Sequence, residues 1–225
     1  MNRVIAIDGP AGAGKSSVSR QVGRLLGFVH VDSGALYRVM TWQALRRGVD
    51  TADEAALAAF APTVNVAFAV RDGAVAYAVD GVEPGPAIRT PEINRHASPV
   101  AKAPAVRQRV TQWLRGLRPL GDLIVEGRDI GTVVFPDTPA RFYLDATPEE
   151  RARRRHLEEA QTGVAQQSRE AVMASLVNRD RIDSTRAVAP LRVAEGACFI
   201  DTTNLTFEQV VQAVLERLPP EWRRR

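Results

Sequence analysis

Nine residues near the N-terminus have the types and spacing of a phosphate-binding loop. They are Gly9, Pro10, Ala11, Gly12, Ala13, Gly14, Lys15, Ser16 and Ser17, and they follow the apolar run at 4–7. Glycines here let the backbone turn with its N–H groups pointing inward, and a helix that begins here directs its positive dipole end into the same cavity. In such a loop the lysine reaches the β- and γ-phosphates, and the serine hydroxyl ligates Mg²⁺. The complete pattern predicts a site for a polyphosphate and Mg²⁺ at Lys15 and Ser16, whereas an isolated glycine-rich turn is usually only a turn.

A second polar cluster, Asp32-Ser33-Gly34-Ala35-Leu36-Tyr37-Arg38, follows the next apolar run. Asp32 or Ser33 can cap the helix that begins here, and these two residues alone leave capping and ligand binding open. Arg38 favours ligand binding, because it lies near enough to the helix start to reach a phosphate held at the strand ends.

A third cluster, Glu126-Gly127-Arg128-Asp129-Ile130-Gly131, follows the apolar run at 123–125. A carboxylate that ends a buried strand beside a phosphate loop is where a ligand of Mg²⁺, acting through water, would lie. Glu126 is that candidate. The alternative is a structural carboxylate paired with an arginine, which the adjacent pair Arg128 and Asp129 makes less favourable.

Arginines dominate the last third of the chain. Arg151, Arg153, Arg154 and Arg155 begin one predicted helix, and too few acidic residues, Glu149, Glu150, Glu158 and Glu159, surround them to balance one face. In the next predicted helix Arg179, Asp183 and Arg186 have the spacing i, i+4, i+7 and form a charged stripe where a packing helix should be apolar. Phosphoryl transfer uses such cations, because it spreads negative charge over the moving group.

Strand and helix patterns alternate around these clusters. We expect strands at about 3–8, 28–32, 122–126, 141–145 and 197–201, and helices at about 15–26, 34–48, 52–61, 148–161, 168–182 and 206–218. This alternation is typical of an α/β fold with a parallel sheet, whose ligands bind beyond the carboxyl ends of the strands. Residues 63–102 break the alternation: segments at 64–70 and 74–79, joined by Arg71-Asp72-Gly73, predict a hairpin. We expect a small antiparallel insert on the core and no separate domain.

The composition indicates a globular protein of a reducing compartment. Hydrophobic residues make up 45% and charged residues 25% of the chain, which is ordinary for a globular protein. The net charge is +4, and nearly all of the positively charged side chains are arginines, whose planar guanidinium suits compact anions. No segment approaches the ~20 apolar residues of a membrane span, and the N-terminus does not have the form of a signal peptide. Cys198 is the only cysteine, so we expect a buried thiol and a cytoplasmic protein. We expect the tail at 223–225 to be a solvated terminus.

Four blocks in this order, at 9–17, 32–38, 127–136 and 186–191, make the chain resemble the bacterial cytidylate kinase family. The resemblance spans about residues 3–218 and implies a P-loop nucleoside monophosphate kinase fold: a parallel sheet flanked by helices, a small antiparallel insert and a helical lid. It implies a single, monomeric kinase domain with a core at about 1–32, 103–147 and 187–225, a monophosphate-binding region with the insert at about 33–102, and a lid at about 148–186.

The resemblance also implies a reaction: transfer of the ATP γ-phosphoryl group to CMP or dCMP, giving CDP or dCDP, with Mg²⁺ as cofactor. It assigns Lys15, Arg186 and Arg155 to catalysis and Arg151, with the loop residues, to ATP binding; Arg151 and Arg155 would occupy lid positions. It assigns the substrate contacts to Ser33, Arg38 and Arg128 near the CMP phosphate, Ser98, Arg107 and Asp129 at the cytosine, and Arg179 and Asp183 at the ribose. Glu126 stands where some members of the family carry aspartate. Glutamate keeps the negative charge, but its longer side chain changes the position of the carboxylate.

Two other functions are weighed against this one. The first is a kinase for UMP or a small metabolite on the same fold, and the second is a nucleotide switch or RNA-binding protein. The chain has no Asn-Lys-x-Asp motif and no basic strand interleaved with aromatic residues, which disfavours the second. We therefore expect nucleotides as partners, with no nucleic acid and no membrane. We expect His30, His96 and His156 to be satisfied or surface histidines, and Trp42, Trp113 and Trp222 to pack.

Overall fold

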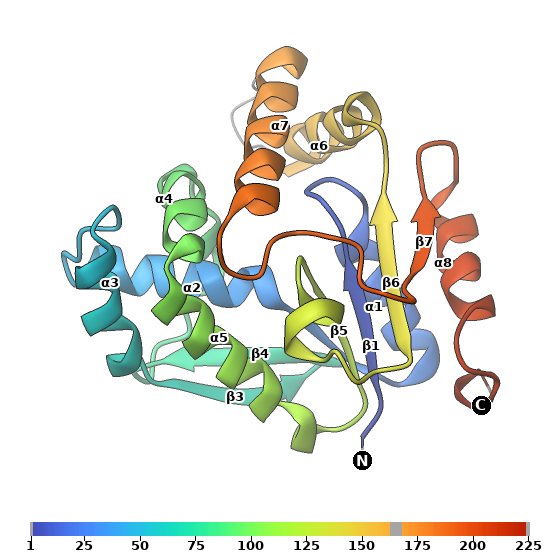
Figure 1. Cartoon of the computed structure of the whole chain (residues 1–225), viewed down its shortest axis with the longest axis horizontal. Coiled ribbons are helices and arrows are strands. Elements are labelled where there is room, and N and C mark those ends of the chain that lie inside the picture. Colours follow the sequence, from blue (N-terminus) through green and yellow to red (C-terminus); the bar gives the residue numbers. More distant parts are fainter. Residues whose placement is uncertain (1, 163–167, 224–225) are drawn as a thin grey trace.

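The chain folds into one seven-stranded sheet with the strand order β3-β4-β2-β5-β1-β6-β7, flanked by helices (Figure 1). The computed structural model describes residues 2–162 and 168–223. Residues 163–167 of the predicted lid and the last two residues of the predicted tail therefore lie outside the described residues.

The described strands and helices have the following bounds. The strands are β1 (Val4–Asp8), β2 (Val29–Asp32), β3 (Val66–Arg71), β4 (Ala74–Val79), β5 (Leu123–Gly127), β6 (Ala140–Asp145) and β7 (Cys198–Asp201). The helices are α1 (Lys15–Leu26), α2 (Ser33–Arg46), α3 (Glu54–Phe60), α4 (Pro91–Lys102), α5 (Pro104–Gly116), α6 (Pro148–Thr162), α7 (Arg169–Thr185) and α8 (Phe207–Glu216). A π-helical turn covers Ile130–Val134, and 3-10 turns cover Ala61–Thr63, Gly85–Arg89, Arg118–Leu120 and Pro220–Trp222.

Five parallel strands form the part of the sheet that carries the site. β1 pairs with β5 and β6, β2 pairs with β5, and β6 pairs with β7, all in parallel register. Glu126 is the register partner of both Ile7 and Asp32, and Gly127 is the partner of Asp8. The polar residues that end β1, β2 and β5 consequently meet at one edge of the sheet, as the α/β pattern predicts.

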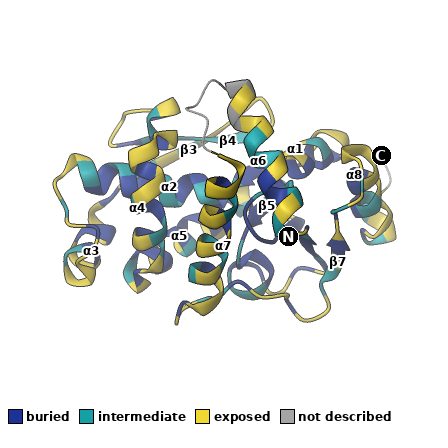
Figure 2. Ribbon diagram, turned by 90° about the horizontal axis from the view of Figure 1, so that it is seen from above, coloured by how far each residue is buried: buried dark blue, intermediate teal, exposed yellow. Residues whose placement is uncertain are grey.

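The two faces of the sheet bury separate apolar cores. One core joins the sheet to α1 and α8 through residues such as Val22 and Val214, and the other joins it to α2, α3, α4 and α5 through residues such as Met40, Leu57 and Val110. Every residue of β1 and β5 is buried, whereas yellow in Figure 2 marks the outer sides of the helices. The buried strands are held on both faces, so the loops at their carboxyl ends start from fixed positions.

The hairpin predicted in the insert forms, and it belongs to the main sheet. β3 and β4 pair in antiparallel register, and β4 joins β2 through a parallel bridge between His30 and Ala74. Residues 91–102, for which the sequence predicted no element, form the helix α4. Pro91 at the first helical position and the cap that Thr90 provides are the local reasons for this helix.

The helix that carries Arg179 and Asp183 ends earlier than the predicted charged stripe. α7 stops at Thr185, and Arg186 caps it with an extended backbone. The i+7 placement of Arg186 on the helix is therefore wrong. Its guanidinium still approaches the helix, with Arg186 Nη1 3.6 Å from Asp183 Oδ1, because the chain turns back after the helix end.

Candidate active site

Glycines give the loop after β1 a backbone that other residues rarely adopt. Gly9, Gly12 and Gly14 have φ of 145°, 79° and 85°. A Cβ on Gly9 would lie 1.9 Å from the carbonyl oxygen of Leu144, which is backbone and cannot move aside. The loop therefore passes directly against the end of β6, at the carboxyl edge of the sheet.

Lys15, the first residue of α1, is buried in this loop. Its Nζ donates a 2.6 Å hydrogen bond to the carbonyl oxygen of Pro10. Burial and, less strongly, the neighbouring Arg128 lower the pKa of Lys15 from 10.5 to about 7. An anion bound at the loop would raise this pKa again, because it would favour the charged ammonium.

Ser16, Glu126 and His30 form a short hydrogen-bonded chain beside Lys15. The Ser16 hydroxyl donates to Glu126 Oε2 at 2.6 Å, and His30 Nε2 donates to Glu126 Oε1 at 2.9 Å. His30 and Glu126 are both buried. The partner of the carboxylate is a histidine, so the alternative of an arginine-paired structural carboxylate is wrong, and the expectation of a satisfied His30 is confirmed. A hydroxyl and a carboxylate side by side fit Mg²⁺, which prefers oxygen ligands and keeps several waters.

Asp8 is a buried acid of the site that the sequence analysis missed. Its two carboxylate oxygens accept the backbone N–H groups of Ile130 and Gly131, each at 2.8 Å. Burial raises the pKa of Asp8 to about 6, although these two hydrogen bonds oppose the shift. The carboxylate thus ties the end of β1 to the turn that follows Arg128 and Asp129. An acidic residue that closes an apolar strand directly before Gly9 was the available signal.

The start of α2 combines a helix cap with a link to β5. Asp32 accepts a backbone N–H of the first turn at 3.0 Å, so the capping interpretation is confirmed for Asp32. Ser33 instead donates to the backbone carbonyl of Glu126 at 2.7 Å. Arg38 lies one turn further along and donates to the side-chain oxygen of Asn94 in α4. The insert therefore contacts this cluster through α4.

Asp129 lies between two buried arginines. Arg107 Nη2 donates to Asp129 Oδ2 at 2.5 Å, and Arg186 Nη2 is 3.6 Å from Asp129 Oδ1. The guanidinium of Arg107 also lies over the ring of Tyr37, 5.2 Å from its centroid. These contacts bring α5, α2, the turn after β5 and the end of α7 together, and Tyr37 joins them without having been predicted as a site residue.

Asp183 connects α7 to the same turn. Its Oδ2 is 3.1 Å from Arg128 Nε, and its Oδ1 is 3.6 Å from Arg186 Nη1. Both arginines therefore share one carboxylate, and each keeps further N–H donors for another acceptor.

Arg179 is a cation without a protein partner. In the described part of the chain no hydrogen bond or ion pair joins its guanidinium to another residue, and its Nε is buried and unpaired. Burial first, and then the nearby cations Arg128, Arg38 and Arg155, lower the pKa of Arg179 to about 10. Arg179 in turn lowers the pKa of Lys15. These cations lie close enough to lower one another's pKa values, and a group of neighbouring cations favours anionic ligands.

Most arginines of α6 have acidic partners within the helix. Arg153 and Arg154 both pair with Glu150, at 2.7 and 2.8 Å, and Arg155 pairs with Glu158 at 2.9 Å. The expectation that acids were too few to balance this helix is therefore wrong, because one glutamate serves two arginines. Arg151 differs: it is buried, and it donates to the carbonyl oxygen of Ala11 at 3.1 Å.

The remaining predicted residues are less closely engaged. Ser98 is half-buried on α4 and makes no hydrogen bond within the described residues, although Arg107 Nη1 donates to the carbonyl of Ala101 nearby at 3.0 Å. Ser17 is exposed. Cys198 is half-buried, so the expectation of a fully buried thiol is wrong.

The other histidines and the tryptophans have ordinary packing roles. His96 Nδ1 shares a 2.7 Å hydrogen bond with Thr51 Oγ1. His156 is half-buried and its Nδ1 has no hydrogen-bond partner among the described residues, so the expectation of a satisfied or surface histidine is wrong for His156. Trp113 packs against Phe68 and Trp222 against Phe28, and the ring of Trp42 lies under a guanidinium.

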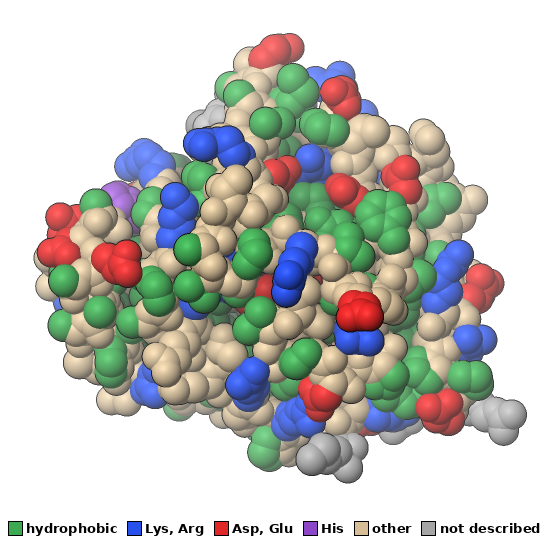
Figure 3. Space-filling model, viewed as in Figure 1, with side chains coloured by type: hydrophobic (Ala, Val, Ile, Leu, Met, Phe, Trp, Pro, Cys, Tyr) green, Lys and Arg blue, Asp and Glu red, His purple; other side chains and the backbone are tan. Residues whose placement is uncertain are grey.

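Two further observations concern the described residues as a whole. They contain no cluster of three or more His, Cys, Asp or Glu side chains that could hold a metal ion. Within the same ranges no helix has the length and apolar character to cross a membrane. On the face drawn in Figure 3 basic and acidic side chains are interspersed.

The chain is similar to known proteins over nearly its whole length. A family model described as cytidylate kinase matches residues 5–219. The chain is 42% identical over 214 residues to the cytidylate kinase of Limosilactobacillus fermentum, covering 95% of this chain and 94% of that one. It is 43% identical over 219 residues to the cytidylate kinase of Geobacter sp. strain M21, covering 97% and 93%. A crystal structure of an uncharacterized protein from Eubacterium ventriosum matches with a TM-score of 0.56 at 9% identity, covering 96% of this chain and 97% of that chain, a likeness of fold alone.

Proposed function

The chain belongs to the cytidylate kinase family, and on that premise we propose which residues carry its reaction. The reaction is transfer of the γ-phosphoryl group of ATP to CMP or dCMP, which gives CDP or dCDP. The proposed donor end is the loop at 9–17, and the proposed acceptor end lies among α2, α5, the turn after β5 and the end of α7.

One observation carries the assignment: Lys15, Arg38, Arg128 and Arg179 are electrostatic neighbours, and Arg179 has no hydrogen-bond or ion-pair partner among the described residues. Leaving desolvated like charges together is unfavourable unless a ligand supplies the opposite charge. The phosphates of two nucleotides would supply it. We propose that Arg38 and Arg128, with Ser33, hold the CMP phosphate.

The chemistry follows from positioning and charge. The acceptor is already an anionic phosphate, so no protein base is needed, and the cations align the two phosphate groups and neutralise charge as it spreads in the transition state. Lys15 would act on the β- and γ-phosphates, and Arg186 and Arg155 on the group in transfer. Ser16 and, through water, Glu126 would hold Mg²⁺, which when bound supplies further neutralisation of the ATP phosphates.

Asp129 is the proposed reader of the base. Arg107 occupies one of its oxygens, and Arg186 stands 3.6 Å from the other, so the carboxylate is oriented and retains lone pairs for the cytosine amine. Arg107 and Ser98 would donate to the cytosine ring nitrogen and carbonyl. Arg179 and Asp183 would contact the ribose. UMP presents a carbonyl in place of the amine, so it would face a carboxylate with no donor.

We propose further that residues 33–102 form the monophosphate-binding region and residues 148–186 the lid, whose closure would exclude water as a competing acceptor. The contact of Arg38 with Asn94 of α4 supports the first assignment. We propose a cytoplasmic monomer without a nucleic-acid or membrane partner, in keeping with a single cysteine. Light scattering of the purified protein would test the monomer.

The substrate assignment is tested by measuring ADP release with CMP, dCMP, UMP, AMP and shikimate as acceptors. We expect kcat/KM for UMP to be lower than for CMP by about two orders of magnitude, on the order of 3 kcal/mol. The reason is that the buried carboxylate of Asp129 would face the carbonyl oxygen of UMP, and neither group can donate a hydrogen bond. Asp129→Ala should reduce kcat/KM for CMP far more than for UMP. Equal losses for both substrates would show that Asp129 only supports Arg107 and Arg186.

A further inference from the structure

Arg151 is the buried side chain that joins the phosphate-binding loop to the helices above it. Its Nη1 donates to the carbonyl oxygen of Ala11 in the loop at 3.1 Å and also to the carboxylate of Asp180 in α7. Its Nε donates to the carbonyl of Ala146, at the end of β6, at 3.0 Å. The side chain is only 6% exposed. A single guanidinium therefore holds three segments that are far apart in sequence.

The bond to Ala11 orients the loop. In a trans peptide the carbonyl oxygen and the following N–H point in opposite directions. With the Ala11 carbonyl held toward Arg151, the N–H of Gly12 must point away from it, and inward-pointing N–H groups are what a phosphate-binding loop requires. α6 also lies close to this peptide, since a Cβ on Gly12 would lie 3.0 Å from Arg151 Cβ and 3.1 Å from the Arg151 carbonyl oxygen.

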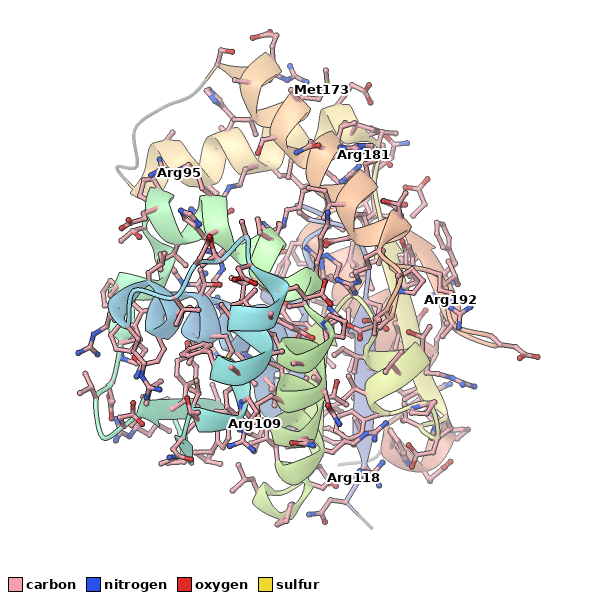
Figure 4. All side chains as sticks on the ribbon, turned by 60° about the vertical axis from the view of Figure 1, so that its left-hand side comes forward. Arg95, Arg109, Arg118, Met173, Arg181 and Arg192 are labelled. Atoms are coloured by element: carbon pink, nitrogen blue, oxygen red, sulfur yellow. The ribbon has the colours of Figure 1, made fainter. Side chains whose placement is uncertain are left out.

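A small apolar cluster reinforces the same junction. Ala11 of the loop packs with Ala152 of α6 and with Val172 and Leu176 of α7, and Met173 packs against them. Figure 4 shows Met173 and Arg181 on α7, which stands above the core. The loop and the two helices thus share a core of their own, separate from the two cores of the sheet.

Asp180 forms an ion pair with Arg151. Its Oδ2 pairs with Arg151, while its Oδ1 is buried without a hydrogen bond. Asp180 follows Arg179 directly and precedes Asp183 by one helical turn. A movement of the loop that shifts Ala11 would therefore pass through Arg151 to the part of α7 that carries proposed acceptor contacts.

We propose that Arg151 is a positioning residue, which orients the Ala11–Gly12 peptide for polyphosphate binding and couples the loop to α7, and does not itself contact ATP. This replaces the expectation of a direct ATP contact, because the Arg151 donors that reach the loop bind its backbone carbonyl. The inference rests on the proposed role of residues 9–17 in ATP binding.

The test compares Arg151→Met with the double variant Arg151→Met/Asp180→Asn, in which no unpaired carboxylate is left behind. Arg153→Met is the matched control, because Arg153 lies on the same helix, is half exposed and pairs only with Glu150 among the described residues. Calorimetry measures the Kd of a non-hydrolysable ATP analogue with Mg²⁺, of ADP and of CMP, each alone, and of CMP with the analogue present. Circular dichroism and thermal unfolding report the fold.

We expect the double variant to fold and to bind the ATP analogue and ADP about 10- to 100-fold more weakly, by similar factors, because the loop N–H groups that cradle the α- and β-phosphates are no longer oriented. The Kd of CMP alone should change less than threefold. The factor by which the analogue changes CMP affinity, expected to exceed 1 in the wild type, should fall toward 1. Arg153→Met should match the wild type throughout.

Three results would overturn the inference. Wild-type nucleotide affinity in the double variant would make Arg151 merely structural, and a loss confined to the triphosphate would indicate a direct contact with the γ-phosphate. A coupling factor unchanged by the substitutions, or equal to 1 in the wild type, would remove the link to α7. Failure of the wild type to bind the analogue would instead contradict the proposed role of the loop itself.

Discussion

Replacing Lys15 by methionine is expected to abolish phosphoryl transfer and, at the same time, to stabilise the ligand-free protein. The loss of transfer follows from removing a cation that acts on the transferring group, and it should be roughly a thousandfold or more. The gain in stability follows from burial, because the ammonium of Lys15 is desolvated near other cations and, among the described residues, donates a hydrogen bond only to the Pro10 carbonyl.

The size of the stabilisation can be worked from the pKa. The pKa of Lys15 falls from 10.5 in the unfolded chain to about 7 in the folded protein. At pH 7 this difference destabilises the native state by on the order of 4 kcal/mol. Methionine removes that term but leaves the Pro10 carbonyl without its partner, which costs about 1–3 kcal/mol. The net gain is about 2 kcal/mol, or roughly 4–8 °C in Tm for a chain of this size.

The pH dependence of unfolding tests the direction of this stability change independently. Between pH 7 and 10.5 the unfolded chain binds more protons at Lys15 than the folded protein does. The contribution of Lys15 to the free energy of unfolding of the wild type therefore rises with pH across that range. The advantage of Lys15→Met should therefore be largest at pH 7 and below, and should disappear toward pH 10. Ligand-free thermal unfolding at several pH values measures it.

The matched control is Lys102→Met, which changes the chain's other lysine at an exposed position and should alter neither activity nor Tm appreciably. A Lys15→Met protein that is less stable than the wild type at pH 7, or whose stabilisation does not shrink at higher pH, would refute the reasoning.

Two further predictions concern the loop and its neighbour. Gly9→Ala should abolish nucleotide binding in calorimetry, because its Cβ would lie 1.9 Å from a backbone oxygen, whereas Gly48→Ala, at φ 66° with open space around it, should cost only about 1–2 kcal/mol in urea unfolding and leave binding intact. Asp8→Asn should reduce kcat/KM for CMP about tenfold, because an amide accepts only one of the two N–H groups that the carboxylate binds. Wild-type CMP affinity should fall as pH drops through about 6, where Asp8 becomes protonated. The CMP phosphate also gains a proton near this pH, so the fall should be shallower in Asp8→Asn but not absent, and an identical profile in the variant would contradict the assignment.

The parts of the fold that follow local rules were predictable. The strand-to-helix position of the loop, the parallel strands and the hairpin segments all have short-range signals, and their bounds agree with the structure to within a few residues. The edge of the sheet at which Lys15, Ser33 and Glu126 meet follows from the parallel order of the strands.

Long-range partners were not predictable in the same way. The bond between His30 and Glu126 and the two bonds of Asp8 join residues about a hundred positions apart, and no spacing in the chain indicates them. The sharing of Glu150 by Arg153 and Arg154 depends on rotamers, and the position of Arg186 near Asp129 depends on the chain turning back after α7 ends at Thr185. Sequence patterns identify which residues carry charge, whereas tertiary packing decides which charges neutralise one another.

The unneutralised charges explain why the ligand-free site is less stable than it could be. Burial lowers the pKa of both Lys15 and Arg179, so both cations are less favourable in the folded protein than in water. A bound polyphosphate would reverse these shifts, and part of its intrinsic affinity would consist of relieving this cost. Such a gain depends on negative charge at the position of the phosphates, so it should be larger for triphosphates than for nucleosides. The two apolar cores of the sheet supply stability that offsets the cost of these buried charges.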